Sequence, residues 1–106
     1  MRAGQLRDLV ELQERFLSRA GDGERTEKWV TTNSVWAKIW EMRGKELLLS
    51  RELHAEVDVK IWIRYRSDID RSWRVKFGSR IFDIHGMSNT QGRNQELLMM
   101  CKEIIA

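Results

Sequence analysis

The most regular alternation of hydrophobic and polar residues in this chain runs from Val57 to Tyr65. The apolar positions are Val57, Val59, Ile61, Ile63 and Tyr65, and the positions between them are Asp58, Lys60, Trp62 and Arg64. Successive side chains of a strand point to opposite faces of its sheet. The pattern therefore predicts a strand with one buried face and one outer face.

The residues that follow predict two more strands. After a turn-like segment at residues 66–71, residues 73–77 alternate again, Gly78-Ser79 is typical of a turn, and Phe82 begins a third strand. Three consecutive strands joined by short turns predict an antiparallel meander spanning Val57–Ile84. Other parts of the chain must then cover its apolar face.

The first part of the chain predicts two strands around a polar loop. After a short turn or helix, we expect strands at about Leu9–Phe16 and Ser34–Glu41. The segment Ser18–Lys28 between them contains two glycines and is predicted to be an exposed hairpin tip. The second strand carries bulky apolar residues on both faces. Its tryptophans and the nearby Trp29 fit either the core of a small domain or an interface.

One helix is predicted, over Arg43–Ala55, because this segment is rich in leucine and glutamate and contains no proline. At about 100° per residue, Leu49 and Leu53 share a face with the preceding Met42, and this face is expected to pack on the sheet. Leu48 lies on a second face, which fits either a protein partner or a helix buried in a groove.

The end of the chain predicts a final strand. A polar loop at Gly86–Gln95 precedes the apolar run that begins at Glu96. Helix and strand both fit this run, and we choose a strand at Glu96–Lys102 because the sheet would otherwise keep an open edge. The strand would place Leu98 and Met100 on one face, and Leu97, Met99 and Cys101 on the other.

Together these elements predict a mainly β protein with one α-helix. The fold class is a small antiparallel β-barrel or sandwich of about six strands. The 106 residues are enough for a single domain, residues 1–106, with a modest hydrophobic core. No apolar run is long enough for a transmembrane helix, and the first residues show no apolar signal core, so we expect neither membrane insertion nor secretion.

Charge narrows the choice of partners only slightly. The net charge is +3, from 19 basic and 16 acidic residues. The part of the meander from Lys60 to Arg80 is locally more basic, since its basic residues are Lys60, Arg64, Arg66, Arg71, Arg74, Lys76 and Arg80, against only Asp68 and Asp70. This fits a solvated outer face of the sheet. It also fits a basic surface that meets an acidic partner or a nucleic-acid backbone.

The search for catalytic or metal-binding chemistry yields no site. His54 and His85 have no cysteine or histidine partner at a zinc-binding spacing. Phosphate-binding and dinucleotide-binding loops and a nucleophile elbow are absent from the sequence. Cys101 lies in an apolar run and is expected in the core. We therefore predict a protein that is not an enzyme and that uses no cofactor and no metal.

The ordered series of residues resembles the phage head-tail joining (head closure) protein family over Gly4–Glu103. The matching residues are Gly4, Leu6, Arg7, Val10, Leu12, Gln13, Arg15, Gly23, Trp29, Val35, Trp36, Ala37, Ile39, Gly44, Glu46, Val59, Ile61, Ile63, Arg64, Tyr65, Arg74, Val75, Gly78, Phe82, Ile84, Gly86, Arg93, Leu98, Met100 and Cys101. No single piece is specific, but the order and spacing of the series are.

The resemblance implies a structural virion protein of a tailed phage or prophage. Members look like small β-barrels or sandwiches with one helix. They assemble as rings at the head-tail interface, close the DNA-filled head below the portal and its adaptor, and present a surface to the tail. The implied partners are portal or adaptor proteins, tail-completion or tail-tube proteins, further copies of the chain and packaged DNA. The implied location is the virion, and before assembly the cytoplasm of the bacterial host.

Some members of the family act as stoppers, with a loop that projects into the central channel. The segment in the corresponding position here is the predicted leucine-rich helix, which favours ring assembly over a plug. Ring subunits need two different lateral surfaces, because head-to-tail contacts are heterologous. Candidate interface residues are Asp22, Gly23, Trp29, Leu48, Trp62, Arg64, Arg66 and Arg93, and the loops Gly21–Lys28 and Gly86–Gln95 are expected to contact neighbouring rings.

Two other functions compete with this one. The first is a single-strand nucleic-acid binding module, in which Trp62 stacks on bases and Lys60, Arg64 and Arg66 contact phosphates. The second is a small basic nuclease that depends on His85.

Overall fold

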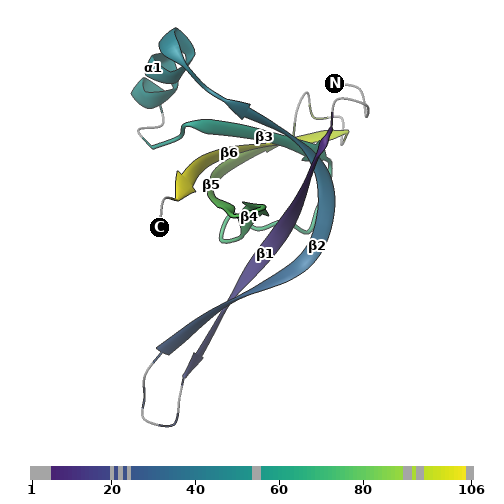
Figure 1. The fold of residues 1–106 in the computed structure, drawn as a ribbon, viewed down its shortest axis with the longest axis vertical. Helices are drawn as coiled ribbons and strands as arrows, with labels where there is room; N and C mark the ends of the chain where they lie inside the picture. Colours follow the sequence, from purple (N-terminus) through teal and green to yellow (C-terminus); the bar gives the residue numbers. More distant parts are fainter. Residues whose placement is uncertain are drawn as a thin grey trace.

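Six antiparallel strands close into a barrel in the computed structural model, which describes residues 6–19, 21, 23, 25–53, 56–89, 92 and 95–104. The elements are β1 (Asp8–Arg19), β2 (Arg25–Glu41), α1 (Gly44–Leu53), β3 (Val59–Arg64), β4 (Arg74–Phe77), β5 (Arg80–Asn89) and β6 (Glu96–Ile104). Around the barrel the order is β1-β2-β3-β6-β5-β4, and β4 pairs with β1 to close it (Figure 1). The predicted class, mainly β with one helix, is confirmed.

Alternate residues of the strands fill the barrel. Val59, Ile61 and Ile63 of β3 are buried, which confirms the alternation predicted for this segment. Leu97, Met99 and Cys101 of β6 are also buried, as predicted. Burial confirms Cys101 as a core residue and raises the pKa of its thiol above the ordinary value. Each large apolar side chain buried in this way stabilises the fold by roughly 1.5–3 kcal/mol.

The predicted meander is wrong in one respect: β3 and β4 are not neighbours. β3 pairs with β2 and β6, whereas β4 pairs with β5 and β1. Residues 65–73 connect β3 to β4 and bury Ile69 and Trp73 in the core. Alternation locates strands but does not say which strands pair, and this connection is long enough to cross the barrel. The β4–β5 hairpin is confirmed, with Gly78 at a φ of 60° that favours glycine.

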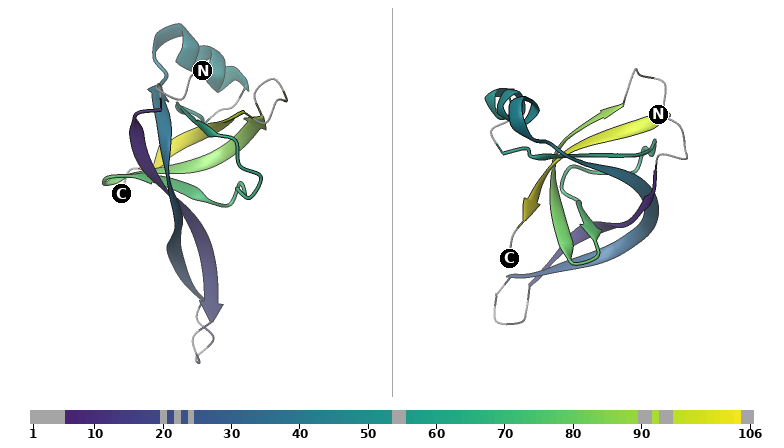
Figure 2. Two further views of the ribbon diagram at one scale, coloured as in Figure 1. Left: turned by 90° about the vertical axis from the view of Figure 1, so that its right-hand side faces the viewer. Right: turned by 45° about the horizontal axis from the view of Figure 1, so that its top comes forward.

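β1 and β2 continue together well beyond the barrel as a two-stranded ribbon (Figure 1 and Figure 2). β1 pairs with β4 only over Glu11–Gln13, and β2 pairs with β3 only over Ala37–Glu41, but β1 and β2 pair with each other as far as Arg19 and Arg25. We call residues 14–19 and 25–30 the hairpin arm. It gives the molecule its elongated shape, with extents of 48 × 28 × 26 Å.

The arm makes both of its strands longer than predicted. The prediction ended the first strand at Phe16 and began the second at Ser34, whereas β1 reaches Arg19 and β2 starts at Arg25. A hairpin tip in the Ser18–Lys28 segment is confirmed, although residues 26–28 belong to β2. Much of the arm is exposed on both faces, so its sequence lacks the alternation that marks a half-buried strand.

α1 projects from the barrel at the end opposite the arm (Figure 2). The prediction that Leu49 and Leu53 pack with Met42 on the sheet is wrong, because their side chains are 60% and 80% exposed while Met42, which precedes the helix, is buried. Ser50 is the buried residue of the helix. No helix in the described part of the chain is long and apolar enough to cross a membrane.

Candidate interaction surface

The outer face of β2 and β3 carries an aromatic strip centred on Lys38. The ammonium nitrogen of Lys38 lies 5.6 Å from the centroid of the Trp40 ring and 5.5 Å from that of Trp62. Trp36 extends the strip, is 56% exposed, and faces Leu9 of β1 across the strand pair. We call these five residues the aromatic strip. Large exposed apolar side chains that gather on one face are typical of protein interaction sites.

Glu46 joins the aromatic strip to α1. Its carboxylate accepts a hydrogen bond from Trp40 Nε1 at 2.6 Å and another from Lys60 Nζ at 3.3 Å. The bond from Trp40, and then the Lys60 ammonium, lower the pKa of Glu46. The carboxylate is therefore ionised at neutral pH and fixes the first turn of the helix against the outer face of the barrel.

Three leucines of α1 are turned to solvent. The side chains of Leu48, Leu49 and Leu53 are 64%, 60% and 80% exposed. Because residues four apart lie on one face of a helix, Leu49 and Leu53 form one apolar patch, and Leu48 belongs to another side. An exposed helix with apolar groups on two sides is well suited to contacts with another protein.

The base of the hairpin arm is held by a stacked pair. The guanidinium carbon of Arg74 lies 4.1 Å from the centroid of the Trp29 ring, and Arg74 Nε donates to Gln13 Oε1 at 2.7 Å. Partial burial lowers the pKa of Arg74, though an arginine stays charged at neutral pH. Farther out, the apolar side chains are unprotected: Phe16 is 49% and Leu17 58% exposed. The arm is therefore anchored at its base and carries exposed apolar side chains farther out.

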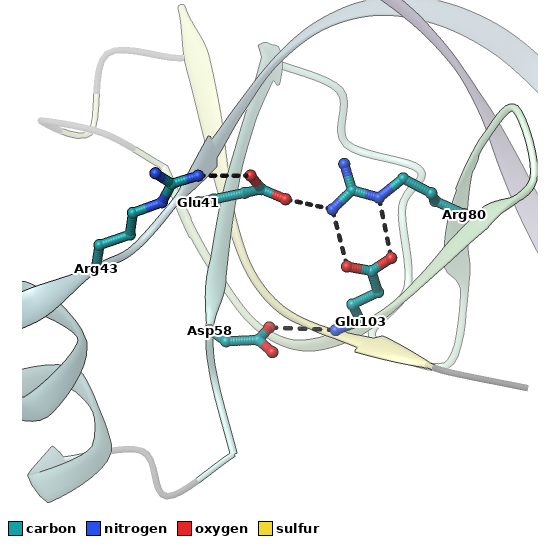
Figure 3. A network of polar contacts seen from close by, with 5 residues as sticks. All are labelled: Glu41, Arg43, Asp58, Arg80 and Glu103. Carbon is teal, nitrogen blue, oxygen red and sulfur yellow. Dashed lines mark hydrogen bonds and ion pairs between the residues drawn. The ribbon is translucent and has the colours of Figure 1, made fainter.

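A network of polar contacts connects residues at or next to the ends of four strands, β2, β3, β5 and β6 (Figure 3). Arg80 of β5 donates to both carboxylate oxygens of Glu103 of β6, at 2.9 and 2.8 Å, and also to Glu41 of β2. Asp58, before β3, accepts from the backbone N–H of Glu103 at 3.2 Å. These contacts raise the pKa of Arg80 and lower that of Glu103. The network is a structural clasp, since every charge in it has a partner.

The structure scatters the candidate interface residues over several parts of the molecule. Leu48 lies exposed on α1, and Trp29 is half-buried in the arm under Arg74. Gly23 is exposed at the arm tip with a φ of 89°. Asp22 and Arg93 lie outside the described residues.

The remaining three candidates, together with Lys60, were also the proposed nucleic-acid platform. Trp62 is half-buried beneath Lys38, and Arg64 is exposed. Arg66 pairs with Asp68 at 2.7 Å, which raises its pKa, and donates to Asn33 at 2.9 Å. Because Lys38 occupies one face of the indole and Arg66 is engaged, the geometry gives base stacking no specific support.

Sequence reasoning missed the most exposed residues of the candidate surface. Trp36 and Trp40 are more exposed than Trp62, and Phe16 and Leu17 project from an arm that was assigned partly to a loop. One signal was available for the tryptophans: they share a strand face with Lys38, whereas Val35, Ala37 and Ile39 occupy the other face. No comparable signal marks the arm.

No group of three or more histidine, cysteine, aspartate or glutamate residues in the described ranges is placed to hold a metal ion. His85 lines a cleft with Arg71, whose guanidinium donates to the backbone carbonyl of His85 at 2.9 Å. That contact holds the connection at residues 65–73 against β5. It involves the backbone of His85 and not its imidazole, so it gives no support to a catalytic role for His85.

Two sequence comparisons indicate the same protein family, and a solved structure shows a similar fold. A family model described as phage head completion protein matches residues 1–104. Head completion protein gp7 of Enterobacteria phage HK97 is 25% identical over 107 residues, which cover 96% of each chain. The solution structure of protein SF1141 from Shigella flexneri 2a has a TM-score of 0.75 and 31% identity, and covers 97% of this chain and 96% of that one.

A similar fold also occurs in a virion. A chain of the native gene transfer agent particle has a TM-score of 0.64 and 22% identity, with 95% of this chain and 97% of that chain covered. At this identity the likeness concerns the fold alone.

Proposed function

Because this chain belongs to the phage head completion protein family, we propose that it assembles as a ring at the head-tail interface of a tailed phage or prophage. It is a structural protein of the virion. In the proposed role, the ring closes the DNA-filled head below the portal and adaptor, and its free side is the docking surface for the tail. This role is mechanical and requires no catalytic step.

One observation carries the proposal: exposed apolar groups lie at opposite ends of the molecule. Leu48, Leu49 and Leu53 are exposed on α1, and Phe16 and Leu17 are exposed on the arm. A closed ring built from one kind of subunit uses two different surfaces on each copy, one for each neighbour. A barrel with two unlike apolar projections meets this requirement, and a barrel with one patch does not.

Two further segments are assigned to the neighbouring rings. The arm tip, within residues 21–28, and residues 86–95 are proposed contacts to the portal–adaptor side and the tail side, although residues 86–89 belong to β5 and not to the predicted loop. The segment between β2 and β3 is a regular helix tied to the barrel through Glu46, so we assign it to subunit or partner contacts rather than to a channel plug.

The test is light scattering on the purified chain, alone and mixed with the portal–adaptor complex of its source phage. The proposal expects the mixture to gain a fixed number of copies per complex, in one cooperative step. A folded chain that adds no mass to the complex at high concentration would contradict it. Salt titration with single-stranded oligonucleotides is the parallel control, because nucleic-acid binding weakens steeply with salt whereas the apolar contacts proposed for the ring do not.

A further inference from the structure

The hairpin arm has two strand edges that no described strand covers. Past Gln13, β1 has β2 as its only partner, and before Ala37, β2 has β1 as its only partner. An uncovered edge presents a row of backbone N–H and C=O groups that can pair with another chain. A two-stranded ribbon is also only marginally stable by itself. The arm is therefore the part of this fold that gains most from a further strand.

The arm lacks two features that keep an edge from pairing, proline and a bulge, although it does carry charged residues. The chain has no proline, and the strand irregularity between β1 and β2 lies at Leu12 and Gln13, at the rim of the barrel rather than in the arm. The β2 side contains Trp29 and Val30, residue types that favour strands. The barrel removes some of its other edges by closing on itself, through the β1–β4 pairing at Glu11–Gln13.

Charges along the arm indicate which chain covers these edges. In the register of the arm, Glu14 of β1 and Lys28 of β2 lie on one face, and Arg15 of β1 and Glu27 of β2 lie on the other. For these four residues the two strands carry opposite signs on each face, whereas Arg19 and Arg25, which are paired in the register nearer the tip, are both basic. Among the four, a β1 edge beside a β2 edge brings unlike charges together, whereas two β1 edges or two β2 edges bring like charges together. Like charges directly opposite each other are unfavourable in a sheet.

We infer that the partner is a second copy of this chain, and that the β1 edge of one arm pairs with the β2 edge of the next. The inference rests on the proposed ring. Around a ring axis all arms point the same way, so β2 of one copy and β1 of its neighbour run antiparallel, as β1 and β2 do within a copy. Each junction is heterologous, which is what ring closure requires.

A single register satisfies both charge pairs. In an antiparallel pair the two residue numbers of each opposed pair add to a constant. Glu14 opposite Lys28 and Arg15 opposite Glu27 share the same sum, and this register also places Phe16 opposite Thr26. Within one copy the register differs by two residues, since Phe16 lies opposite Lys28. A shift of two keeps every side chain on its own face of the sheet, so the joined arms form one continuous surface.

The experiment uses two single charge reversals, Glu14→Lys and Lys28→Glu. Each variant alone places like charges at every junction, so its uptake on the portal–adaptor complex, followed by light scattering at low salt, should weaken roughly fivefold or more per junction. Mixed in equal amounts, the two variants restore unlike charges at every junction between one variant and the other, and uptake should return toward the wild-type level as the variants alternate around the ring. Both charge changes also alter the arm internally, but mixing cannot repair a change inside one molecule.

The outcomes separate this inference from the proposed function. Restored uptake in the mixture alone supports pairing of arm edges between copies. Wild-type uptake by both single variants, or no recovery on mixing, overturns the inference and leaves the ring in place, provided that circular dichroism shows folded variants. Failure of the wild-type chain itself to join the complex overturns the proposed function and this inference together.

Discussion

At the scale of single residues, the barrel depends on a few side chains with no exposure at all. Phe82 is the largest fully buried side chain and lies in the same cluster as Leu12 and Ile61. Removal of such a ring leaves a cavity that the surrounding strands fill only in part. The stability of the monomer is therefore concentrated in the barrel, away from the surfaces proposed for assembly.

The first prediction compares two phenylalanines. Phe82→Ala should reduce the free energy of unfolding by about 3–5 kcal/mol, because it creates a cavity in the core. Phe16→Ala, in the exposed arm, should change it by no more than about 0.5 kcal/mol. Urea denaturation of the two variants checks this, and equal losses would show that the arm is part of the folded core.

The second prediction concerns the Arg80–Glu103 pair. Arg80 lowers the pKa of Glu103 below its ordinary value of 4.5. A lowered pKa in the folded state stabilises the fold above the pKa of the unfolded chain, and this contribution disappears as the pH falls through the folded-state pKa. Arg80→Gln should therefore destabilise the protein near neutral pH, by less than about 1 kcal/mol since the pair is partly exposed, and make little difference near pH 2.

Urea midpoints measured across this pH range test the second prediction. Arg43→Gln serves as the control, because the Arg43 side chain is 85% exposed and reaches Glu41 only at 3.8 Å. A difference between wild type and Arg80→Gln that stays undiminished in acid would point instead to packing, since the Arg80 guanidinium lies 5.0 Å from the Phe82 ring.

At the scale of elements, the sequence was informative wherever one face of an element meets the core. Alternation located β3 and the β4–β5 hairpin. β6 was predicted because the sheet would otherwise keep an open edge, and alternation then placed Leu97, Met99 and Cys101 on one face, which is the buried one. Alternation failed where both faces meet solvent, as in the arm. Helix propensity located α1 within two residues. Its exposed leucines imitate a packed face, because periodicity records that apolar residues share a side and not what that side touches.

The third prediction concerns α1. Changing Leu48 and Leu53 together to lysine should leave the free energy of unfolding within about 0.5 kcal/mol of wild type, because both side chains are largely exposed. The same change should weaken uptake on the portal–adaptor complex, where charges would replace apolar contacts. Arg51→Ala, on the same helix, is the matched control for light scattering. Unaltered uptake by the leucine variant would remove α1 from the proposed interface.

At the scale of the whole molecule, the family was within reach of the sequence while the interface was not. The ordered series that resembles the family includes core residues of the barrel such as Val59, Ile61 and Ile63. The series can therefore identify the family even without a catalytic motif. Which surface residues form an interface depends on the partner proteins, and the sequence of this chain does not include them. Trp62 was selected for its place in the clearest strand, yet Trp36 and Trp40 are the more exposed residues of the same outer face.

The central claim is that this chain completes phage heads as a structural ring component. Its most direct test uses DNA-filled heads from the source phage that lack this protein, incubated with the purified chain and then with tails. The account predicts that the chain sediments with the heads and restores infectious particles to near the wild-type number. Heads that neither bind the folded chain nor gain infectivity would contradict it.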